Sequence, residues 1–546
     1  MPVMVSLKSL YNETSVKCRI SKLEASQAKQ AMAPTPLVML QRLLEEPQHL
    51  LIVLTIFFLA ILSSISLSRT WSKKTNLPPS PPKFPFIGNF YQMGDLLHHS
   101  FRDLSRKYGP IMLLHLGHTP VLVISSAEMA REIMKNHDSV FTNRPALTAA
   151  QIILYKCQDI GYAPYGEYWK QMRKICVMDL LSVKRVQSFK IIREEETDFF
   201  MKKITQSCSQ GSPVNLSEML LTLSNNILSR CAFGKIPEDV NGFNRFGKLA
   251  REAMQLLGAF SIGDFFPCFR WMDVLTGLTR RMKRTSQQLD VLFDSIIDEH
   301  LMKRDIHHSL DTKQDFVDFL LHVQKENKLN IDISKDSIKA ILMDMFIAGT
   351  DTTATVIEWA MAELLKSPDT MKKAQAEVRK IVGKKMKVKE ENIQQMEYLK
   401  CVIKEALRLH PPVPLLVPRE SVTSTKIKEY TIPSKTRVYI NVWAIQRDPV
   451  LWDKADEFIP ERFIGSTIDF RGKDFELVPF GSGRRSCPGV SFGIAVVELA
   501  LANLLYWFDW DLPNGEIKEK LDMSEFFGIT VNKKIPLHVL PSNYMA

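Results

Sequence analysis

One cysteine, Cys487, lies in a loop whose composition excludes both a helix and a strand interior: PFGSGRRSCPG, residues 479–489. Three glycines and two prolines in so short a stretch interrupt regular secondary structure and shape a turn. The residues that follow, VSFGIAVVELALANLLYW, are apolar at helical spacing and end near Trp507. We therefore predict a thiol held in a shaped loop just ahead of a helix, with Pro488 suited to its first turn.

The composition is that of a globular protein with a large core. Hydrophobic residues make up 45% and charged residues 24% of the 546 residues, and there is no internal repeat. The formal net charge of +11 suits an acidic membrane surface or an acidic protein partner. No dense Arg/Lys tail is present, so the charge does not favour nucleic-acid binding.

The eight cysteines are scattered and none forms a CxxC pair, which argues against a zinc site or a dithiol redox motif. Scattered cysteines in a large chain fit reduced thiols that face the cytosol. Most of them are interpreted as ordinary core thiols, and Cys487 differs from them by its neighbours.

Residues 49–68 read HLLIVLTIFFLAILSSISLS and contain no charged side chain. About 20 apolar residues are enough to cross a bilayer. The basic residues that follow place the rest of the chain in the cytosol by the positive-inside rule. A buried core helix is the alternative, but the proline-rich stretch NLPPSPPKFPFIGN reads as a stiff spacer. The sequence therefore predicts an extension of uncertain role at 1–48, an anchor at 49–68, a basic and proline-rich hinge at 69–88 and one body at 89–546.

The body is predicted to be mainly helical with a small β-rich region. Residues 110–117 and 119–125 read as a hairpin, and residues 126–411 show mostly amphipathic helical periodicity. A second β-rich region is expected at 422–443. Two further strands are expected at 527–531 and 534–540.

The longest predicted helix runs from Ser334 to Lys366 and contains AGTDTT at 348–353. Glycine and threonine are poor helix formers, and a threonine hydroxyl can bond to a carbonyl one turn earlier. One interpretation is a kinked structural helix. The other is a polar notch in an apolar wall.

Four patterns occur together in this chain. FGSGRRSCPG matches F-x-x-G-x-R-x-C-x-G, AGTDTT supplies an acid and a threonine in a long helix, KEALRLHPP supplies E-x-x-R, and PERF precedes the cysteine loop. From about Pro78 to its end the chain resembles a cytochrome P-450. YGEYWKQMRK, FIAGTDTT and INVWAIQRDP are similar to the plant A-type group, in the 71 clan.

The resemblance implies a haem b cofactor with Cys487 as the axial ligand of its iron, since a thiolate donates electrons that favour O–O cleavage. It also implies that Phe480 shields the sulfur and that Gly483 lets the loop approach the macrocycle. Arg485, Trp169 and Arg173 are expected at the haem propionates. Glu405, Arg408 and Arg462 are expected to form a buried, non-catalytic ion-paired triad.

In the family's chemistry, Thr352 handles bound dioxygen and Asp351 relays protons. The sequence contains no flavin or nicotinamide motif, so the resemblance implies electrons from NADPH through an NADPH-cytochrome P-450 reductase in the same membrane, the endoplasmic reticulum. A basic face for this partner is expected among Lys170, Lys174, Lys184, Arg185 and Arg484.

The resemblance also suggests a pocket for a small lipophilic substrate, lined by Phe260, Ile347, Val413, Leu416, Phe526 and Ile529. The specific candidate is an aromatic aldoxime converted toward a hydroxynitrile. A terpenoid or phenylpropanoid hydroxylase remains an alternative, as does a haem-thiolate dehydratase or isomerase. A haem-binding sensor is the non-enzyme alternative, and the complete acid–threonine notch argues against it.

Overall fold

The computed structural model divides into two compact units, Met1–Lys74 and Thr75–Ala546. The expected extension at 1–48 lies outside the described residues, and so does most of the expected anchor at 49–68. The structure describes residues 51–52, 55–56, 59, 76–236, 245–306, 314–326, 331–385 and 387–544.

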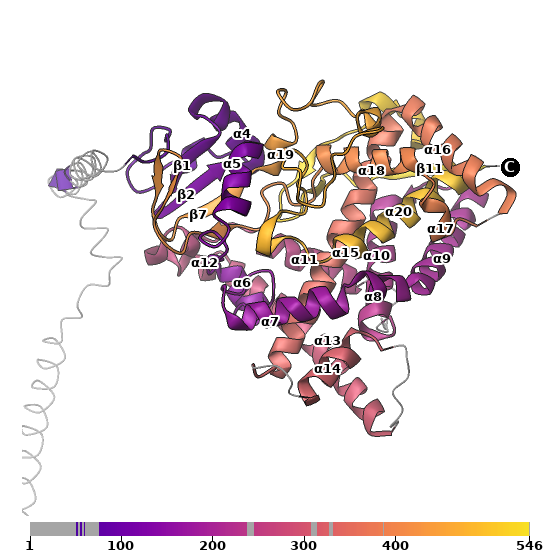
Figure 1. Cartoon of the computed structure of the whole chain (residues 1–546), viewed down its shortest axis with the longest axis horizontal. Helices are drawn as coiled ribbons and strands as arrows, with labels where there is room; N and C mark the ends of the chain where they lie inside the picture. The colour runs from indigo at the N-terminus through magenta and orange to yellow at the C-terminus, as the bar shows by residue number, and fades with distance from the viewer. Residues whose placement is uncertain are drawn as a thin grey trace, which may run out of the picture. The chain divides into compact units, whose positions relative to one another are not determined.

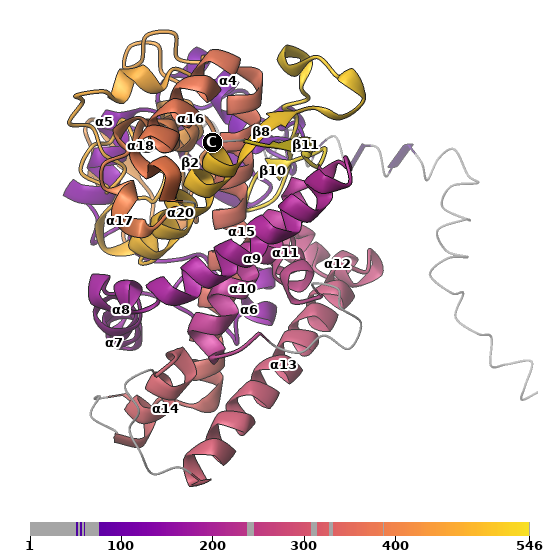
Figure 2. The same ribbon diagram turned by 90° about the vertical axis from the view of Figure 1, so that its right-hand side faces the viewer.

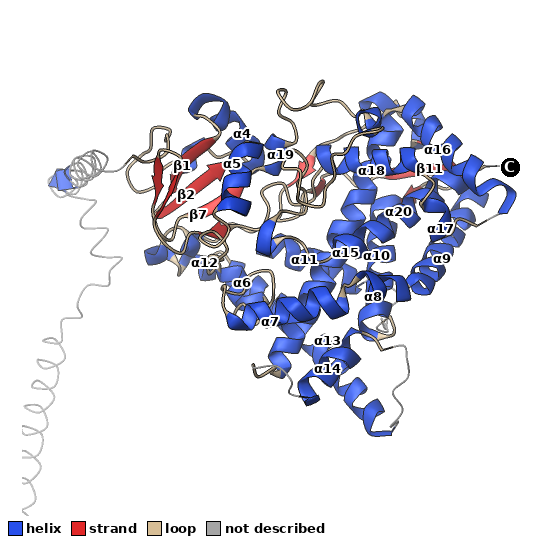
Figure 3. Ribbon diagram, viewed as in Figure 1, coloured by secondary structure: helices blue, strands red, loops and turns tan. Residues whose placement is uncertain are grey.

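The second unit is mainly helical, as predicted, and its strands gather into small sheets (Figure 3). Its helices are α4 Leu97–Tyr108, α5 Ala127–Arg131, α6 Thr148–Ile153, α7 Glu167–Ile175, α8 Val183–Ser188, α9 Lys190–Ser209, α10 Leu216–Phe233, α11 Arg245–Leu257, α12 Met272–Leu275, α13 Leu278–Ile306, α14 Phe316–Glu326, α15 Lys335–Lys366, α16 Pro368–Val382, α17 Glu390–Ile393, α18 Glu397–Leu409, α19 Val442–Ile445 and α20 Val490–Trp507.

The largest sheet has the strand order β1-β2-β7-β4, and β1 pairs with β2 as the predicted hairpin. Strand β2 runs parallel to β7, with Leu122 opposite Val438. The smaller sheets are β3-β11-β8, β9-β10 and β5-β6. The strands are β1 Ile111–Leu116, β2 Thr119–Ile124, β3 Val214–Asn215, β4 Arg419–Glu420, β5 Thr425–Ile427, β6 Tyr430–Ile432, β7 Arg437–Ile440, β8 Phe508–Asp511, β9 Glu525–Phe526, β10 Asn532–Lys533 and β11 His538–Asn543.

Helix α15 runs through the centre of the helical part and packs against α10, α11 and α20 (Figures 1 and 2). Ser334 caps its first turn, because the Ser334 hydroxyl accepts from the Ser337 N–H. Its 32 residues span roughly 50 Å at 1.5 Å per residue. Among the described helices, α15 and α20 are long and apolar enough to cross a membrane. However, 78% of the most apolar 18-residue stretch of α15 and 67% of that of α20 are buried inside the protein.

Two local expectations need correction. Residues 527–531 were expected to form a strand, but the strands are β9 and β10 on either side of this segment, which makes the turn between them. Helix α20 begins at Val490, so Pro488 lies before the helix and Gly489 takes the N-cap position. The proline therefore shapes the loop that carries Cys487 rather than the helix itself.

Candidate functional site

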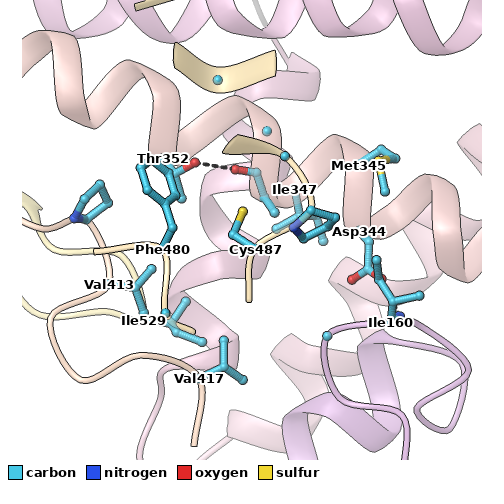
Figure 4. A pocket seen from close by; sticks show the side chains of 18 of the residues that line it. Ile160, Asp344, Met345, Ile347, Thr352, Val413, Val417, Phe480, Cys487 and Ile529 are labelled. Atoms are coloured by element: carbon cyan, nitrogen blue, oxygen red, sulfur yellow. Dashed lines mark hydrogen bonds between the residues drawn. The ribbon is translucent and has the colours of Figure 1, made fainter. Parts of the chain in front are cut away.

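The loop before α20 holds Cys487 with its sulfur facing a cavity (Figure 4). The Cys487 N–H donates to the Phe480 carbonyl at 2.9 Å, which closes the loop. Gly483 has a φ of +73°, and a Cβ there would lie 2.2 Å from the Met134 carbonyl oxygen. Only glycine fits this position, so the loop's shape depends on it.

The Cys487 side chain is accessible through the cavity that it lines. Burial raises the pKa of this thiol, while the Gly489 N–H and the Arg173 guanidinium act in the opposite direction. A thiol in this setting becomes a thiolate when a cation binds the sulfur. The Cys487 sulfur is therefore placed where it can bind a cation in the cavity.

The cavity has a volume of about 300 Å³ and lies between the Cys487 loop and α15. Its α15 wall includes Met345, Ala348, Gly349 and Thr352, and Phe480 borders the sulfur side. Four residues expected in an apolar substrate pocket do line it: Ile347, Val413, Leu416 and Ile529.

The other two expected pocket residues lie elsewhere. Phe260 is 51% exposed, and its ring stacks on Phe265 at 5.3 Å, outside the cavity lining. Phe526 is 44% exposed and pairs with Asn532 in the β9–β10 hairpin. The hairpin turn instead presents Ile529 to the cavity, so the expectation that Phe526 lines it is wrong.

One edge of the cavity is crowded with guanidinium groups. Arg485 donates to the Thr142 carbonyl at 2.8 Å and lies 4.2 Å from the Trp169 ring centre. Burial, followed by the charge of Arg419, lowers the pKa of Arg485 to about 9. Trp169 donates its indole N–H to the Ile160 carbonyl at 3.0 Å, and Arg173 donates to the Ser486 carbonyl beside Cys487.

Arg144, which the sequence did not single out, completes this edge. Its guanidinium donates to the Gly161 and Val417 carbonyls, and burial together with Arg485 and Arg419 lowers its pKa well below the usual value. Arg419 itself pairs with Asp138 at 3.0 Å. Carboxylate groups of a ligand would relieve the repulsion among the guanidinium groups of Arg144, Arg173 and Arg485. This edge therefore suits the two propionates of a haem.

The AGTDTT segment stays helical throughout α15, with Thr352 facing the cavity. The Thr352 hydroxyl donates to the Ala348 carbonyl at 2.6 Å, the contact drawn in Figure 4. Its neighbour Asp351 is fully buried and lies outside the cavity lining. The structure therefore separates the two predicted residues onto different sides of the helix.

Asp351 is held by residues that no sequence pattern indicated. Arg251 of α11 donates from Nε to the Asp351 carboxylate at 2.9 Å, and the Asn532 amide lies 3.5 Å from its second oxygen. The Thr355 hydroxyl contacts both the Asp351 carbonyl and Asn532. Arg251 is 26% exposed, so the Asp351 carboxylate is one side chain away from solvent.

The structure brings Glu405, Arg408 and Arg462 together in one ion-paired group. Arg408 binds Glu405 through two bonds of 2.7 and 2.8 Å, and Arg462 adds a third at 3.1 Å. Arg408 also donates to the Gln446 and Ala455 carbonyls. The group ties α18 to the segment that leads to the Cys487 loop, and its members lie outside the cavity lining.

Comparison with known proteins places this geometry in a family. The profile of the Cytochrome P-450 family matches residues 78–538. The chain is 54% identical to cytochrome P-450 71A1 of Persea americana, over 84% of this chain and 92% of that one. It is 51% identical to desmethylyatein synthase of Sinopodophyllum hexandrum, over 89% and 98% of the two chains.

Two further similarities bear on function and fold. A phenylacetaldehyde oxime monooxygenase of Prunus mume is 48% identical, over 90% of this chain and 94% of that one. The solved structure of a zebra fish cytochrome P-450 with progesterone superposes with a TM-score of 0.69 at 25% identity, and it covers 82% of this chain and 99% of that chain.

Proposed function

Because the chain belongs to the cytochrome P-450 family and is a haem-dependent monooxygenase of the plant 71 type, we propose that Cys487 is the axial ligand of its haem iron. One observation supports this most strongly: the Cys487 sulfur, the guanidinium edge and the Thr352 hydroxyl all border the same cavity. When bound, the haem supplies the iron at which dioxygen is reduced and one oxygen atom passes to the substrate.

The residues around Cys487 would hold the cofactor and protect the sulfur. Arg485, Arg173 and Arg144 would bind the carboxylates of haem b, and the Trp169 ring would pack beside them. Phe480, whose ring contacts Phe470 at 5.6 Å, would keep water from the sulfur. Gly483 keeps the loop in the shape that aims the sulfur at the cavity.

We assign proton handling to Thr352 and Asp351. The Thr352 hydroxyl is positioned at the cavity and can donate a proton there after turning from the Ala348 carbonyl. Asp351 lies on the other side of α15, where its pairing with the partly exposed Arg251 would let it exchange protons with solvent. Glu405, Arg408 and Arg462 would support the fold of the Cys487 side without touching the reacting atoms.

The axial-ligand assignment is tested by the spectrum of the reduced, carbon monoxide-bound enzyme. Cys487→Ala should abolish the red-shifted Soret band that a thiolate ligand produces. The matched control is Cys401→Ala, a buried free thiol on α18. The assignment is wrong if the Cys401 variant loses the band and the Cys487 variant keeps it.

Electrons are proposed to arrive from an NADPH-cytochrome P-450 reductase. Lys170, Lys174, Lys184 and Arg484 are exposed, whereas Arg185 is partly buried and donates to the Gln314 carbonyl. Replacing Lys170 and Lys174 with Glu should slow reduction of the iron and weaken its salt dependence. Unchanged reduction kinetics would exclude this surface.

The proposed substrate is a small lipophilic plant metabolite, and the specific candidate is an aromatic aldoxime. The apolar cavity and the 48% identical phenylacetaldehyde oxime monooxygenase support this candidate. The 51% identical desmethylyatein synthase favours a second candidate, oxidation of a different plant metabolite. Substrate-induced spectral shifts with phenylacetaldehyde oxime, followed by product analysis, separate the two.

The proposed location is the endoplasmic reticulum membrane, with residues 49–68 as a single anchor and the body at 89–546 in the cytosol. The uncharged apolar run, its basic flank and the proline-rich hinge support this arrangement. Protease added to intact microsomes should digest the body. Full protection of the body would contradict the orientation.

A further inference from the structure

A pair of aspartates joins α15 to the segment between α6 and α7. Asp344 lies on α15 and borders the cavity, whereas Asp159 is fully buried. Figure 4 shows the Asp344 side chain beside Ile160, the neighbour of Asp159 in the sequence. Neither aspartate belongs to the sequence motifs that identify the family.

Each carboxyl group accepts a hydrogen bond from the same short segment. The Ile160 N–H donates to Asp344 Oδ2 at 2.6 Å, and the Tyr162 N–H donates to Asp159 Oδ2 at 2.6 Å. Between these two donors lies Gly161, where a Cβ would be 3.0 Å from Asp159 Oδ2 and 3.5 Å from Asp344 Oδ1. The two carboxyl groups therefore lie against the same α-carbon.

The pair has one oxygen atom without a donor. Asp159 Oδ1 is buried and has no hydrogen-bond partner among the described residues, while the Asp344 carboxyl lies within hydrogen-bonding reach of Asp159. Two carboxylates this close cannot both stay ionised in a buried site. A proton on Asp344 would supply the missing donor to Asp159.

The electrostatic surroundings agree with this placement of the proton. Burial, and then the charge of Asp159, raise the pKa of Asp344 well above its usual range. Burial also raises the pKa of Asp159, but the Tyr162 N–H, Arg485 and Arg144 act against that rise. The pKa of Asp344 is thus raised further than that of Asp159, which favours the proton on Asp344 and the negative charge on Asp159.

Other titratable groups surround the pair on every side. Arg144 approaches from the loop after Phe141 and Arg485 from the Cys487 loop. The remaining groups, a third arginine among them, come from α7, the turn after it and the segment after α6. Together, the surrounding groups are Arg144, Arg485, Arg173, Tyr168, Cys176, Cys157 and Tyr162. Burial raises the pKa of the Tyr162, Cys157 and Cys176 side chains, so these remain neutral near pH 7.

The segment that the pair holds also holds the guanidinium edge. The Ile160 carbonyl accepts from both Arg485 and the Trp169 indole, and the Gly161 carbonyl accepts from Arg144 at 2.8 Å. The Ala163 carbonyl accepts from Arg485 at 2.6 Å. The N–H groups of this segment thus bind the carboxyl pair, and its carbonyl groups bind the arginines.

We propose that Asp159 and Asp344 share one proton and act as a positioning pair, which fixes residues 159–163 and, through their carbonyl groups, orients Arg144 and Arg485 at the cavity edge. This inference goes beyond the proposed function, because the shared proton and the fixed segment exist whichever substrate the enzyme takes. The pair positions other groups and does not itself react.

The test uses the fact that asparagine resembles a protonated aspartic acid. Asp344→Asn keeps a donor toward Asp159 but cannot ionise, whereas Asp344→Leu removes the bond. In the holoenzyme, the wild-type minus Asp344→Asn infrared difference spectrum at neutral pH should contain the carbonyl stretch of a protonated carboxylic acid, shifted in D₂O. Absence of this band overturns the shared proton.

Ligand binding tests the positioning role with phenylimidazole, whose binding shifts the haem Soret band. Its affinity should stay within about twofold in Asp344→Asn and fall roughly tenfold or more in Asp344→Leu, as expected for loss of a charge-assisted hydrogen bond. The wild-type affinity should also fall at alkaline pH as Asp344 ionises, and Asp344→Asn should lack this fall. Equal losses in both variants would overturn the proposal.

A matched control separates this pair from any buried aspartate that holds a loop. Asp273 accepts from the Ser261 hydroxyl and from the Ile262 and Gly263 N–H groups. Asp273→Asn should leave both the infrared band and the alkaline fall in place. Because the infrared band needs no substrate and no thiolate, its loss or survival is independent of whether Cys487 binds the iron.

Discussion

Helix α15 carries Asp344 and Asp351, seven residues apart, and the protein compensates these two enclosed acids in different ways. Seven residues are almost two full turns, so both lie on nearly the same side of the helix. Asp351 meets the guanidinium of Arg251 at 2.9 Å. Asp344 meets a second acid, Asp159, and two backbone N–H groups.

The difference shows that the neighbouring element, and not the residue type, decides what a buried acid can do. Where α11 packs against α15, a partly exposed arginine keeps Asp351 paired and connected to solvent. Where the segment after α6 packs against α15, the acid pair shares a proton at the cavity edge. The first arrangement suits proton exchange, and the second suits a fixed structure.

The largest expected effect separates the two acids by turnover. Asp351→Asn should slow product formation by about 10² to 10⁴, the usual contribution of a positioned proton donor, while haem content and the carbon monoxide band are retained. Asp344→Asn should retain most of the rate. Product formed per NADPH consumed, measured for both variants, checks this prediction.

Thr352→Ala is the companion variant for that measurement. It should keep the substrate-induced spectral shift but release more peroxide per NADPH, because the hydroxyl at the cavity is lost. If Asp351→Asn turns over at the wild-type rate with normal coupling, the ion pair with Arg251 is purely structural.

The second prediction concerns the stability of the paired acid. Arg251→Met leaves the fully buried Asp351 without its cation, and the free energy of unfolding should fall by about 3 kcal/mol, the lower end for a broken buried pair because one side of Arg251 is open to water. The double variant Arg251→Met with Asp351→Asn should recover much of this loss. Denaturant unfolding of the wild type, the two single variants and the double variant gives the coupling energy between Arg251 and Asp351 directly.

Local composition made one part of this site predictable. The Cys487 loop could be recognised because glycine and proline act within a few residues, and Gly483 indeed occupies a position that only glycine fits. Helical periodicity likewise predicted α15 from Ser334 to Lys366 and the hairpin of β1 and β2. Each of these features depends on neighbours in sequence.

Long-range packing made the rest unpredictable. Arg251 lies 100 residues before Asp351, and Ile160 lies 184 residues before Asp344, so no spacing in the sequence indicates either contact. Phe526 lies in the two-residue strand β9 and Ile529 in the turn that follows it, so which of them reaches the cavity depends on how this hairpin packs. The pocket expected from the resemblance therefore included Phe260 and Phe526, which do not line the cavity.

The third prediction follows the pH dependence of stability at the second acid. The pKa of Asp344 is raised on folding, so its favourable contribution is complete below the unfolded value and is lost as the pH rises toward the folded value. The stability of Asp344→Asn relative to wild type should therefore increase with pH across this window. Thermal unfolding from acid to mildly alkaline pH measures it, and a pH-independent difference would contradict the raised pKa.

The smallest effect is expected from adding one methyl group between the two carboxyls. Gly161→Ala places a Cβ 3.0 Å from Asp159 Oδ2, closer than ordinary packing allows, and should cost about 1 kcal/mol of stability. The matched control is Gly166→Ala, where a Cβ meets nothing within 4 Å and the expected loss, about 0.5 to 1 kcal/mol, comes only from replacing the glycine N-cap of α7. Because the methyl group pushes the carboxyls apart, Gly161→Ala should also weaken the pH dependence of stability, whereas Gly166→Ala should leave it unchanged. If Gly161→Ala lowers stability but keeps the wild-type pH dependence, the carboxyls interact through the backbone segment and not with each other.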